Sequence, residues 1–190
     1  MKEKQRCEWS EKDDLYREYH DKEWGTPLHD DQKLFEFLVL ESFQAGLSWY
    51  IVLKKRDNFR KAFVNFDAKK MAKFDTKKAE QLMKDEGIIR NRLKIEAAIN
   101  NAKCYLQIQK EFGSFDKYVW SFTGGKTIVN KRKSLRDIPG KTPESDAMSK
   151  DMGKRGFKFR GSTICYAFMQ ATGMVDDHVE HCWKKTKKKN

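Results

Sequence analysis

The stretch KKAEQLMKDEGIIRNRLKIEAAINNAK, residues 77 to 103, predicts a helix, a short turn and a second helix. Apolar residues recur at helical spacing on both sides of the turn, which is typical of two helices that pack together. We expect the turn at Gly87-Ile88-Ile89-Arg90-Asn91. The second helix would begin there with free backbone N–H groups and the positive end of its dipole, where a phosphate oxygen can bind. Three basic side chains surround this position: Arg90, Arg92 and Lys94.

An ordinary antiparallel helix pair explains the same pattern without a ligand. Its contacts would be made by Leu82, Ile88, Leu93 and Ile95. Because a single glycine marks the hairpin, the stretch leaves both interpretations open.

Helical periodicity continues along most of the chain, which holds only three prolines, and alternating strand patterns are almost absent. We therefore expect an all-α protein. The expected helices span 11–21, 31–45, 48–63, 68–73, 77–86, 92–110, 114–122, 143–154 and 162–172. Residues 123–141, rich in glycine and charge, are expected to form a long loop or linker.

Several residues predict where helices begin and end. Asp30 or Asp31 can cap the second helix, and Thr142, followed by a proline, has the pattern of an N-cap for the eighth. Gly87 and Gly173 stand where a helix C-terminus favours a left-handed residue.

The chain of 190 residues has 40 Lys and Arg against 28 Asp and Glu, a net charge of +12. Five of the lysines lie in residues 184–190, which we expect to be a basic, disordered tail after a single two-lobed domain at 1–183. The body stays basic without them. A basic body favours a nucleic-acid partner, since each neutralised phosphate releases counterions. The alternative is a surface charged only for solubility.

No apolar run approaches the roughly 20 residues of a membrane span, and the first ten residues, MKEKQRCEWS, lack the apolar core of a signal peptide. We therefore expect a cytoplasmic protein without a membrane partner. In a reducing compartment, its four cysteines are expected to be buried thiols or metal ligands rather than disulfides.

Cysteine and histidine residues stand near both ends of the chain and suggest a metal site. Cys7 and His20 lie near the N-terminus, and His178 and Cys182 near the C-terminus. Two nitrogen and two sulfur ligands suit tetrahedral Zn²⁺, and four protein ligands would make the site structural. His181 is an alternative ligand. Unrelated thiols and histidines, or a Cys7–Cys182 disulfide, are the other interpretations.

The stretch LESFQAGLSW, residues 40 to 49, places Glu41 where a helix would carry an apolar residue. At 100° per residue Glu41 falls on the stripe of Leu34 and Leu38, opposite Glu36. A buried carboxylate needs a hydrogen-bond donor or a cation. The structural interpretation is a glutamate satisfied by a helix N-terminus or an arginine.

Aromatic residues gather around Glu41 in the sequence: Trp9, Tyr16, Tyr19, Trp24 and Trp49. Aromatic faces and one carboxylate together suit a flat, cationic ligand, although an aromatic core would have the same composition. Gly46-Leu47 then forms either a flexible turn with an apolar wedge or a helix break with Leu47 packed inside.

Six motifs together closely resemble the bacterial DNA-3-methyladenine glycosylase I family over residues 7 to 183. They are Cys7-x-Trp9, Tyr16-x-x-Tyr19-His20-Asp21-x-Glu23-Trp24-Gly25, Glu41-x-x-Gln44-Ala45-Gly46-Leu47-Ser48-Trp49, Gly87-Ile88-Ile89-Arg90, Lys154-Arg155-Gly156-Phe157-Lys158-Phe159 and Asp177-His178-x-x-x-Cys182.

The resemblance implies a two-lobed helix-hairpin-helix DNA glycosylase fold, with one structural Zn²⁺ per chain joining the N- and C-terminal segments. Its implied ligands are Cys7, His20, His178 and Cys182. The implied base pocket contains Glu41 as the catalytic residue, with Tyr19, Trp49, Tyr16, Trp9 and Trp24 binding the substrate. DNA contacts are implied for Gly46 and Leu47, which would fill the gap left by the extruded base, and for Gly87 and Arg90 of the hairpin.

The implied activity is monofunctional hydrolysis: the enzyme flips and excises 3-methyladenine from alkylated double-stranded DNA and leaves an abasic site. We expect it to act as a monomer. The aspartate that usually follows the hairpin in the wider superfamily is not evident here. Two rival classes are a non-enzymatic nucleic-acid-binding helical module, which does not explain Glu41, and a zinc-stabilised interaction protein, which explains only the metal ligands.

Overall fold

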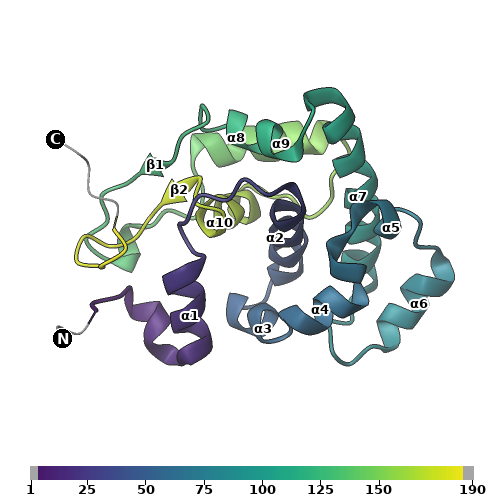
Figure 1. Cartoon of the computed structure of the whole chain (residues 1–190), viewed down its shortest axis with the longest axis horizontal. Coiled ribbons are helices and arrows are strands. Elements are labelled where there is room, and N and C mark those ends of the chain that lie inside the picture. The colour runs from purple at the N-terminus through teal and green to yellow at the C-terminus, as the bar shows by residue number, and fades with distance from the viewer. Residues whose placement is uncertain (1–3, 186–190) are drawn as a thin grey trace.

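The computed structural model describes residues 4–185 and consists almost entirely of helices (Figure 1). The α-helices are α1 (Asp14–Lys22), α2 (Asp31–Gln44), α3 (Trp49–Lys54), α4 (Arg56–Ala62), α5 (Ala68–Met71), α6 (Thr76–Lys84), α7 (Arg92–Phe112), α8 (Phe115–Ser121), α9 (Pro143–Lys154) and α10 (Ser162–Ala171). Short 3₁₀ helices lie at Glu8–Lys12, Val64–Phe66 and Leu135–Asp137. The expected helical class is confirmed.

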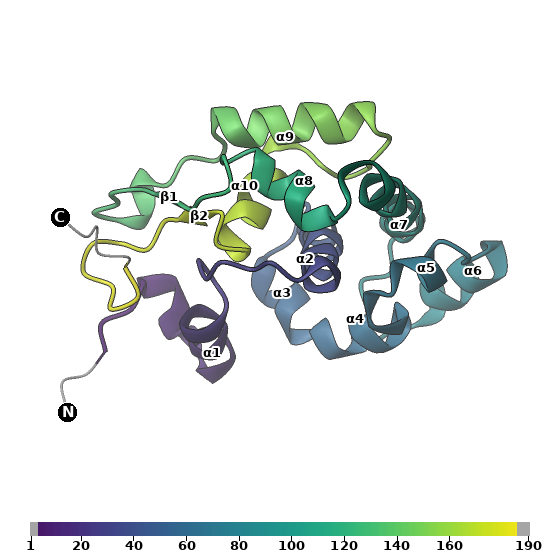
Figure 2. The same ribbon diagram turned by 45° about the horizontal axis from the view of Figure 1, so that its top comes forward.

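Helix α2 runs through the centre of the molecule, where it contacts α3, α7, α8 and α10 (Figures 1 and 2). It begins at Asp30, whose carboxylate accepts a hydrogen bond from the backbone N–H of Lys33 at 2.8 Å. Every residue from 34 to 43 is buried. The expected division into an apolar and a polar face is therefore wrong, because neighbouring helices surround α2 on all sides.

The buried Glu36 of α2 is stabilised by two arginines from α4. Its Oε1 accepts hydrogen bonds from Arg56 Nε at 2.5 Å and from Arg60 Nη2 at 2.9 Å. Arg56 also donates to Glu23, at the end of α1, at 2.7 Å. This ion-pair network joins α1, α2 and α4, and it satisfies a carboxylate that the helical pattern had placed in solvent.

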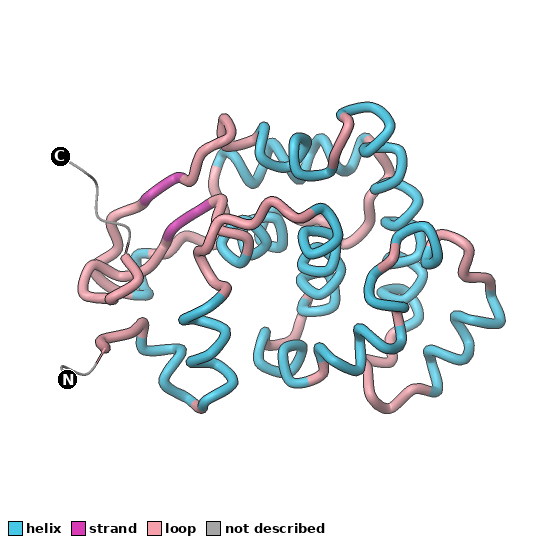
Figure 3. The backbone as a smooth tube through the Cα atoms, in the orientation of Figure 1, coloured by secondary structure: helices cyan, strands magenta, loops and turns pink. Residues whose placement is uncertain are grey.

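Most helix ends differ from the expected ones by one to three residues, and two expected elements differ in kind. The helix expected over 48–63 is divided at Lys55, whose ψ of 2° is not helical. The loop expected over 123–141 contains strand β1 (Ile128–Val129), which pairs in parallel with β2 (Val175–Asp176) (Figure 3). Strands of two residues are too short to produce an alternating pattern, so the sequence could not reveal them.

The helix-turn-helix expected at 77–103 is present as α6 and α7, joined by residues 85–91. Ile88 and Ile95 are buried between them, but Leu93, which an ordinary helix pair would bury, is 67% exposed. Gly173 adopts the expected left-handed conformation with φ of +71°, whereas Gly87 does not. Gly87 is instead confined by close contacts, since a Cβ there would lie 2.9 Å from Asp85 Oδ1.

The segments near the two ends of the chain lie side by side: the Trp183 N–H donates to the Gln5 carbonyl at 2.9 Å. Of the expected basic tail, Lys184 donates to Thr26 Oγ1 at 2.8 Å and Lys185 to the Asp176 carbonyl at 3.3 Å. Its remaining residues, 186–190, lie outside the described part of the chain. None of the helices in residues 4–185 is both long and apolar enough to cross a membrane.

Candidate active site and metal-ligand cluster

A cavity of about 330 Å³ lies where α1, the C-terminal half of α2, the start of α3 and α10 meet. The structure brings all six residues expected in the base pocket to its wall: Trp9, Tyr16, Tyr19, Trp24, Glu41 and Trp49. These residues come from four separate elements. The cavity therefore depends on the packing of those elements rather than on any one motif.

Glu41 is the one carboxylate that lines this cavity, and it is only 3% exposed. Among the described residues it has no hydrogen-bond or ion-pair partner, and its Oε2 is fully buried. Burial raises the pKa of Glu41 to about 8, because the charged form loses its hydration. The interpretation in which an arginine or a helix N-terminus satisfies Glu41 is wrong. Glu36, five residues earlier in α2, is the glutamate that pairs with arginines.

The aromatic residues form a continuous wall beside Glu41. The ring of Trp9 lies 5.2 Å from that of Tyr16 and 5.2 Å from that of Trp24, in edge-to-face contacts. The rings of Tyr19 and Trp49 are 5.4 Å apart and tilted by 45°. Trp49 Nε1 is also buried, and no residue in the described part of the chain accepts a hydrogen bond from it. The wall thus presents ring faces and one free N–H donor to the cavity.

Sequence reasoning missed five residues of the cavity wall: Gln44, Leu135, Ile138, Ala167 and Gln170. Gln44 lies three residues after Glu41 and so on the same helix face, a signal that could have identified it. Leu135 and Ile138 belong to the expected linker, which folds over the cavity. No local pattern connects Ala167 or Gln170 of α10 to Glu41.

Gly46-Leu47 forms a protruding turn between α2 and α3. Gly46 has φ of +76°, which favours glycine, and no atom approaches the position of a Cβ within 4 Å. Leu47 is 41% exposed. The structure therefore places Leu47 at the surface, next to the start of Trp49, instead of packing it inside.

The turn between α6 and α7 differs in detail from the expected cluster of basic residues. The Arg90 guanidinium is half exposed and lies 3.4 Å from Glu86. Lys94 is buried, and its ammonium donates to the carbonyl oxygens of Phe43 at 2.8 Å and Ala45 at 2.6 Å. Lys94 thus caps the C-terminal end of α2 and is not available to a phosphate at the turn.

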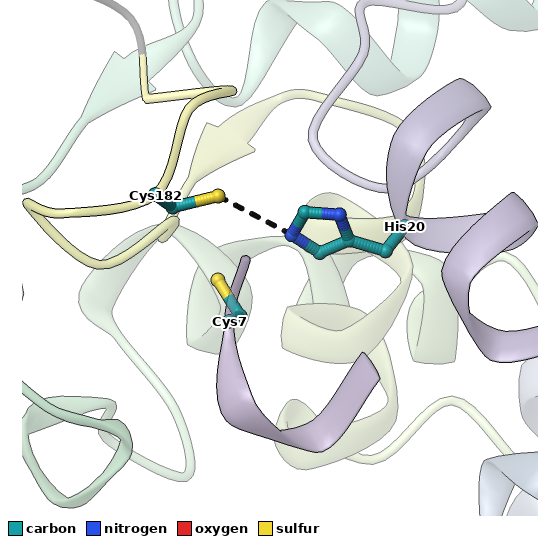
Figure 4. Close-up of side chains that lie close together, drawn as sticks. All are labelled: Cys7, His20 and Cys182. Carbon is teal, nitrogen blue, oxygen red and sulfur yellow. Dashed lines mark hydrogen bonds between the residues drawn. The ribbon is translucent and has the colours of Figure 1, made fainter. Parts of the chain in front are cut away.

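Cys7, His20 and Cys182 lie close together, with one ligand atom of each within 4.8 Å of the others (Figure 4). All three are buried, and Cys182 Sγ is 3.4 Å from His20 Nε2. Hydrogen bonding from the Cys7 thiol, assisted by His20, lowers the pKa of Cys182. A thiolate is the form of cysteine that metals bind. Cys7 and Cys182 are free thiols, so the disulfide interpretation is not supported.

His178 lies beside this cluster, with its ring centroid 5.1 Å from that of His20. Its Nδ1 is 2.9 Å from Asp176 Oδ1, and its Nε2 is buried with no hydrogen-bond partner within residues 4–185. A Cβ on Gly25, which has φ of +69°, would lie 2.5 Å from the His178 ring, so only glycine fits there. His181, the alternative ligand, is exposed and is not in the cluster.

Both histidines have a carboxylate on Nδ1, since His20 Nδ1 lies 2.9 Å from Asp21 Oδ1. Although burial opposes it, hydrogen bonds from Arg6 and His20 lower the pKa of Asp21 to about 2. A carboxylate on Nδ1 leaves Nε2 as the free ligand atom, which is the usual outer contact of a metal-binding histidine. The cluster is therefore a candidate metal site.

Comparisons with known proteins agree over nearly the whole chain. The methyladenine glycosylase family model matches residues 9–185. The DNA-3-methyladenine glycosylase of Haemophilus influenzae is 51% identical over 181 residues, which cover 95% of this chain and 98% of that protein. A crystal structure of a 3-methyladenine DNA glycosylase I has a TM-score of 0.94 at 49% identity, covering 96% of this chain and 100% of that one.

A further similar structure contains the ligand that the relatives' names suggest. It is a variant of a 3-methyladenine DNA glycosylase I in complex with 3-methyladenine. Its TM-score is 0.92 at 37% identity, with coverage of 96% of this chain and 98% of that one.

The buried carboxyl of Glu41 should make stability depend on pH. Its pKa is about 8 in the folded protein against an ordinary value of 4.5. The folded state therefore retains a proton that the unfolded state loses, and stability falls as pH rises from 4.5 to 8. Glu41→Gln removes this dependence. Urea unfolding should find the variant more stable than the wild type at pH 9, by on the order of 5 kcal/mol, and nearly equal at pH 4.5.

Glu36→Gln is the matched control on the same helix. Because Glu36 is paired with two arginines, its neutralisation should destabilise the protein at pH 7 by about 1 to 3 kcal/mol. An equal pH dependence of wild type and Glu41→Gln would mean that Glu41 has an ordinary pKa.

Proposed function

This chain belongs to the methyladenine glycosylase family, and from that premise we propose that it excises 3-methyladenine from alkylated DNA. In the proposed reaction water attacks the sugar carbon C1′, the N-glycosidic bond breaks with its electron pair passing to the base, and an abasic site is left. The observation that carries the proposal is the unpaired, buried carboxylate of Glu41 in an aromatic cavity.

Methylation at N3 gives the base a positive charge while it is attached to the sugar. An ionised Glu41 attracts that charge strongly, because it is buried and the cavity wall offers no competing cation. Its oxygens also accept hydrogen bonds from the exocyclic amino group of adenine. A guanine-type base would instead present a carbonyl oxygen, which the carboxylate repels. A buried acceptor without a partner thus serves both charge recognition and base selection.

The aromatic wall supports the same cation through its ring faces. Because the rings of Tyr19 and Trp49 are in contact at 5.4 Å, we propose that the flipped base lies against both rings, within the cavity. Stacking between them would require the rings to separate. Base flipping costs a few kcal/mol and is cheapest for a damaged base.

The positive charge makes the base a good leaving group, so the protein needs little acid catalysis. We propose that this chain contributes orientation and electrostatic stabilisation of the departing base and of the positive charge that develops on the sugar. Glu41 provides the negative charge for the electrostatic stabilisation. A mechanism that relies on orientation and electrostatics agrees with the absence of an evident aspartate after the hairpin.

The test is incubation with methylated duplex DNA, followed by chromatographic detection of free 3-methyladenine. The wild type should release this base, and Glu41→Gln should release it about a hundredfold more slowly, because it lacks the charge. In the wild type, kcat/KM should rise with pH up to about 8, as Glu41 loses its proton, and Glu41→Gln should lose that rise. No release by folded wild type would refute the proposed function.

We propose further that the double-stranded DNA lies across two surface features. Leu47, exposed on its glycine turn, would fill the space of the extruded base. Arg90, exposed at the turn between α6 and α7, would contact a phosphate together with backbone N–H groups at the start of α7. The Gly87 N–H itself donates to Asp85 Oδ1 at 2.8 Å, so its proposed part is the close approach of backbone and DNA.

Arg90→Ala should weaken binding to duplexes of every sequence and reduce the slope of log K against log salt concentration by about one. Fluorescence anisotropy at several salt concentrations measures both quantities. Lys103→Ala, an exposed lysine within α7, is the control for the loss of one positive charge. If both variants bind alike, the hairpin is not the phosphate contact.

We also propose that Cys7, His20, His178 and Cys182 hold one structural Zn²⁺. The donor set suits this ion, and the unpartnered Nε2 of His178 next to the three clustered residues supports a fourth ligand. With four protein ligands the ion has no open position, so it would join the N-terminal segment to the segment after β2 and take no part in the reaction.

Zinc content should be about one per chain in the wild type and far lower in Cys182→Ser, as measured by atomic absorption after dialysis. The melting temperature should fall with it, because ion binding stabilises the folded state. His181→Ala is the matched control, since His181 is exposed and outside the cluster. Its zinc content should equal that of the wild type; a loss would identify His181 as a ligand.

A further inference from the structure

Another buried carboxylate, Asp177, lies next to Gln170 of the cavity wall and is fully satisfied. It is 0% exposed and follows β2 directly. Its Oδ1 accepts hydrogen bonds from Arg132 Nε at 2.8 Å and Asn130 Nδ2 at 2.9 Å. Its Oδ2 accepts from the Tyr166 hydroxyl and from Gln170 Nε2 at 2.8 Å. Four donors from two segments, the loop at 130–132 and α10, therefore hold this carboxylate in one position.

This network fixes which end of the Gln170 amide faces the cavity. A carboxylate paired with an arginine accepts hydrogen bonds and cannot donate them. Gln170 must therefore turn its NH₂ group toward Asp177, since the reversed amide would set two oxygens against each other. Its Oε1 then points away from Asp177. Gln170 lines the cavity, and none of the described residues donates a hydrogen bond to this oxygen.

The cavity contains one other glutamine, and it is not fixed in this way. Gln44 lines the same cavity, but its amide makes no hydrogen bond to any residue in 4–185. It can turn either end to a ligand and so cannot distinguish a donor from an acceptor. Gln170 can distinguish a donor from an acceptor, because reversing its amide would break the hydrogen bond to Asp177.

The ligand of the proposed function has two N–H groups on its exocyclic amino nitrogen. If Glu41 accepts one of them, the second still needs an acceptor, because a buried donor without a partner is costly. We propose that Gln170 Oε1 accepts this second hydrogen bond, and that Asp177 is the positioning residue that holds it ready. This inference rests on the proposed function and adds a specificity determinant on α10, in the cavity that Glu41 also lines.

The test measures the affinity of the protein for two free bases, with quenching of tryptophan fluorescence as the signal of binding. One is 3-methyladenine, and the other is 3-methylpurine, which lacks the exocyclic amino group. Gln170→Leu should bind 3-methyladenine about tenfold more weakly and bind 3-methylpurine unchanged, because only the first ligand loses a hydrogen bond. Equal losses for both bases would mean a packing role and overturn the proposal, as would no loss for either.

Gln109→Leu is the matched control, because Gln109 Nε2 also donates to a carboxylate, Asp31 Oδ2 at 2.7 Å, and lies outside the cavity. It should leave the affinities for both bases unchanged. Asp177→Asn tests the positioning role, since it permits either orientation of the Gln170 amide. The preference for 3-methyladenine over 3-methylpurine should fall several-fold in this variant, whereas a merely structural role would weaken both affinities equally.

The wild type separates this inference from the proposed function. If it neither releases nor binds 3-methyladenine, the proposed function fails, and this inference fails with it. If the wild type does both and Gln170→Leu keeps the full preference for 3-methyladenine, only the role of Gln170 is overturned.

Discussion

The complete burial of α2 is the constraint on which the rest of the structure depends. Because helices surround it on every side, both of its central glutamates are removed from water, and each requires an explanation. Glu36 forms ion pairs with two arginines of α4, and this network holds α1, α2 and α4 together. Glu41 receives nothing from the described residues and faces a cavity. The same helix therefore carries one carboxylate that stabilises the fold and one that lines a cavity without a partner among the described residues.

An unpaired buried carboxylate destabilises the empty protein, and binding can recover that cost. A cationic base with amino hydrogens supplies the charge and the donors that Glu41 lacks, so the interaction is strongest for the ligand that compensates both. The Gln170 side chain, which lines the same cavity, also has one polar end without a partner among the described residues. There the network around Asp177 satisfies one end of the side chain and leaves the other end for the ligand.

The two ends of the described chain meet next to the cavity. Cys7 and His20 meet Cys182 beside His178, and the His178 ring packs at 4.6 Å against Trp24 of the cavity wall. Asp177, one residue before His178, anchors Gln170. The metal-ligand cluster and the cavity are thus built on adjacent residues. Because the His178 ring packs against Trp24, the cluster and the aromatic wall are in direct contact.

The sequence by itself determined the helical class, most helix positions, a cap at Asp30 or Asp31, and the identity of the six residues that the structure places around the cavity. These follow from local spacing and from motifs that the family shares. The tertiary structure alone decided that Glu36 is paired and Glu41 is not, that Lys94 caps α2, and that Gln170 and the segment at Leu135 reach the cavity. The reason is physical: helical periodicity reports which residues leave solvent, but the partner that each buried polar group meets depends on segments distant in the sequence.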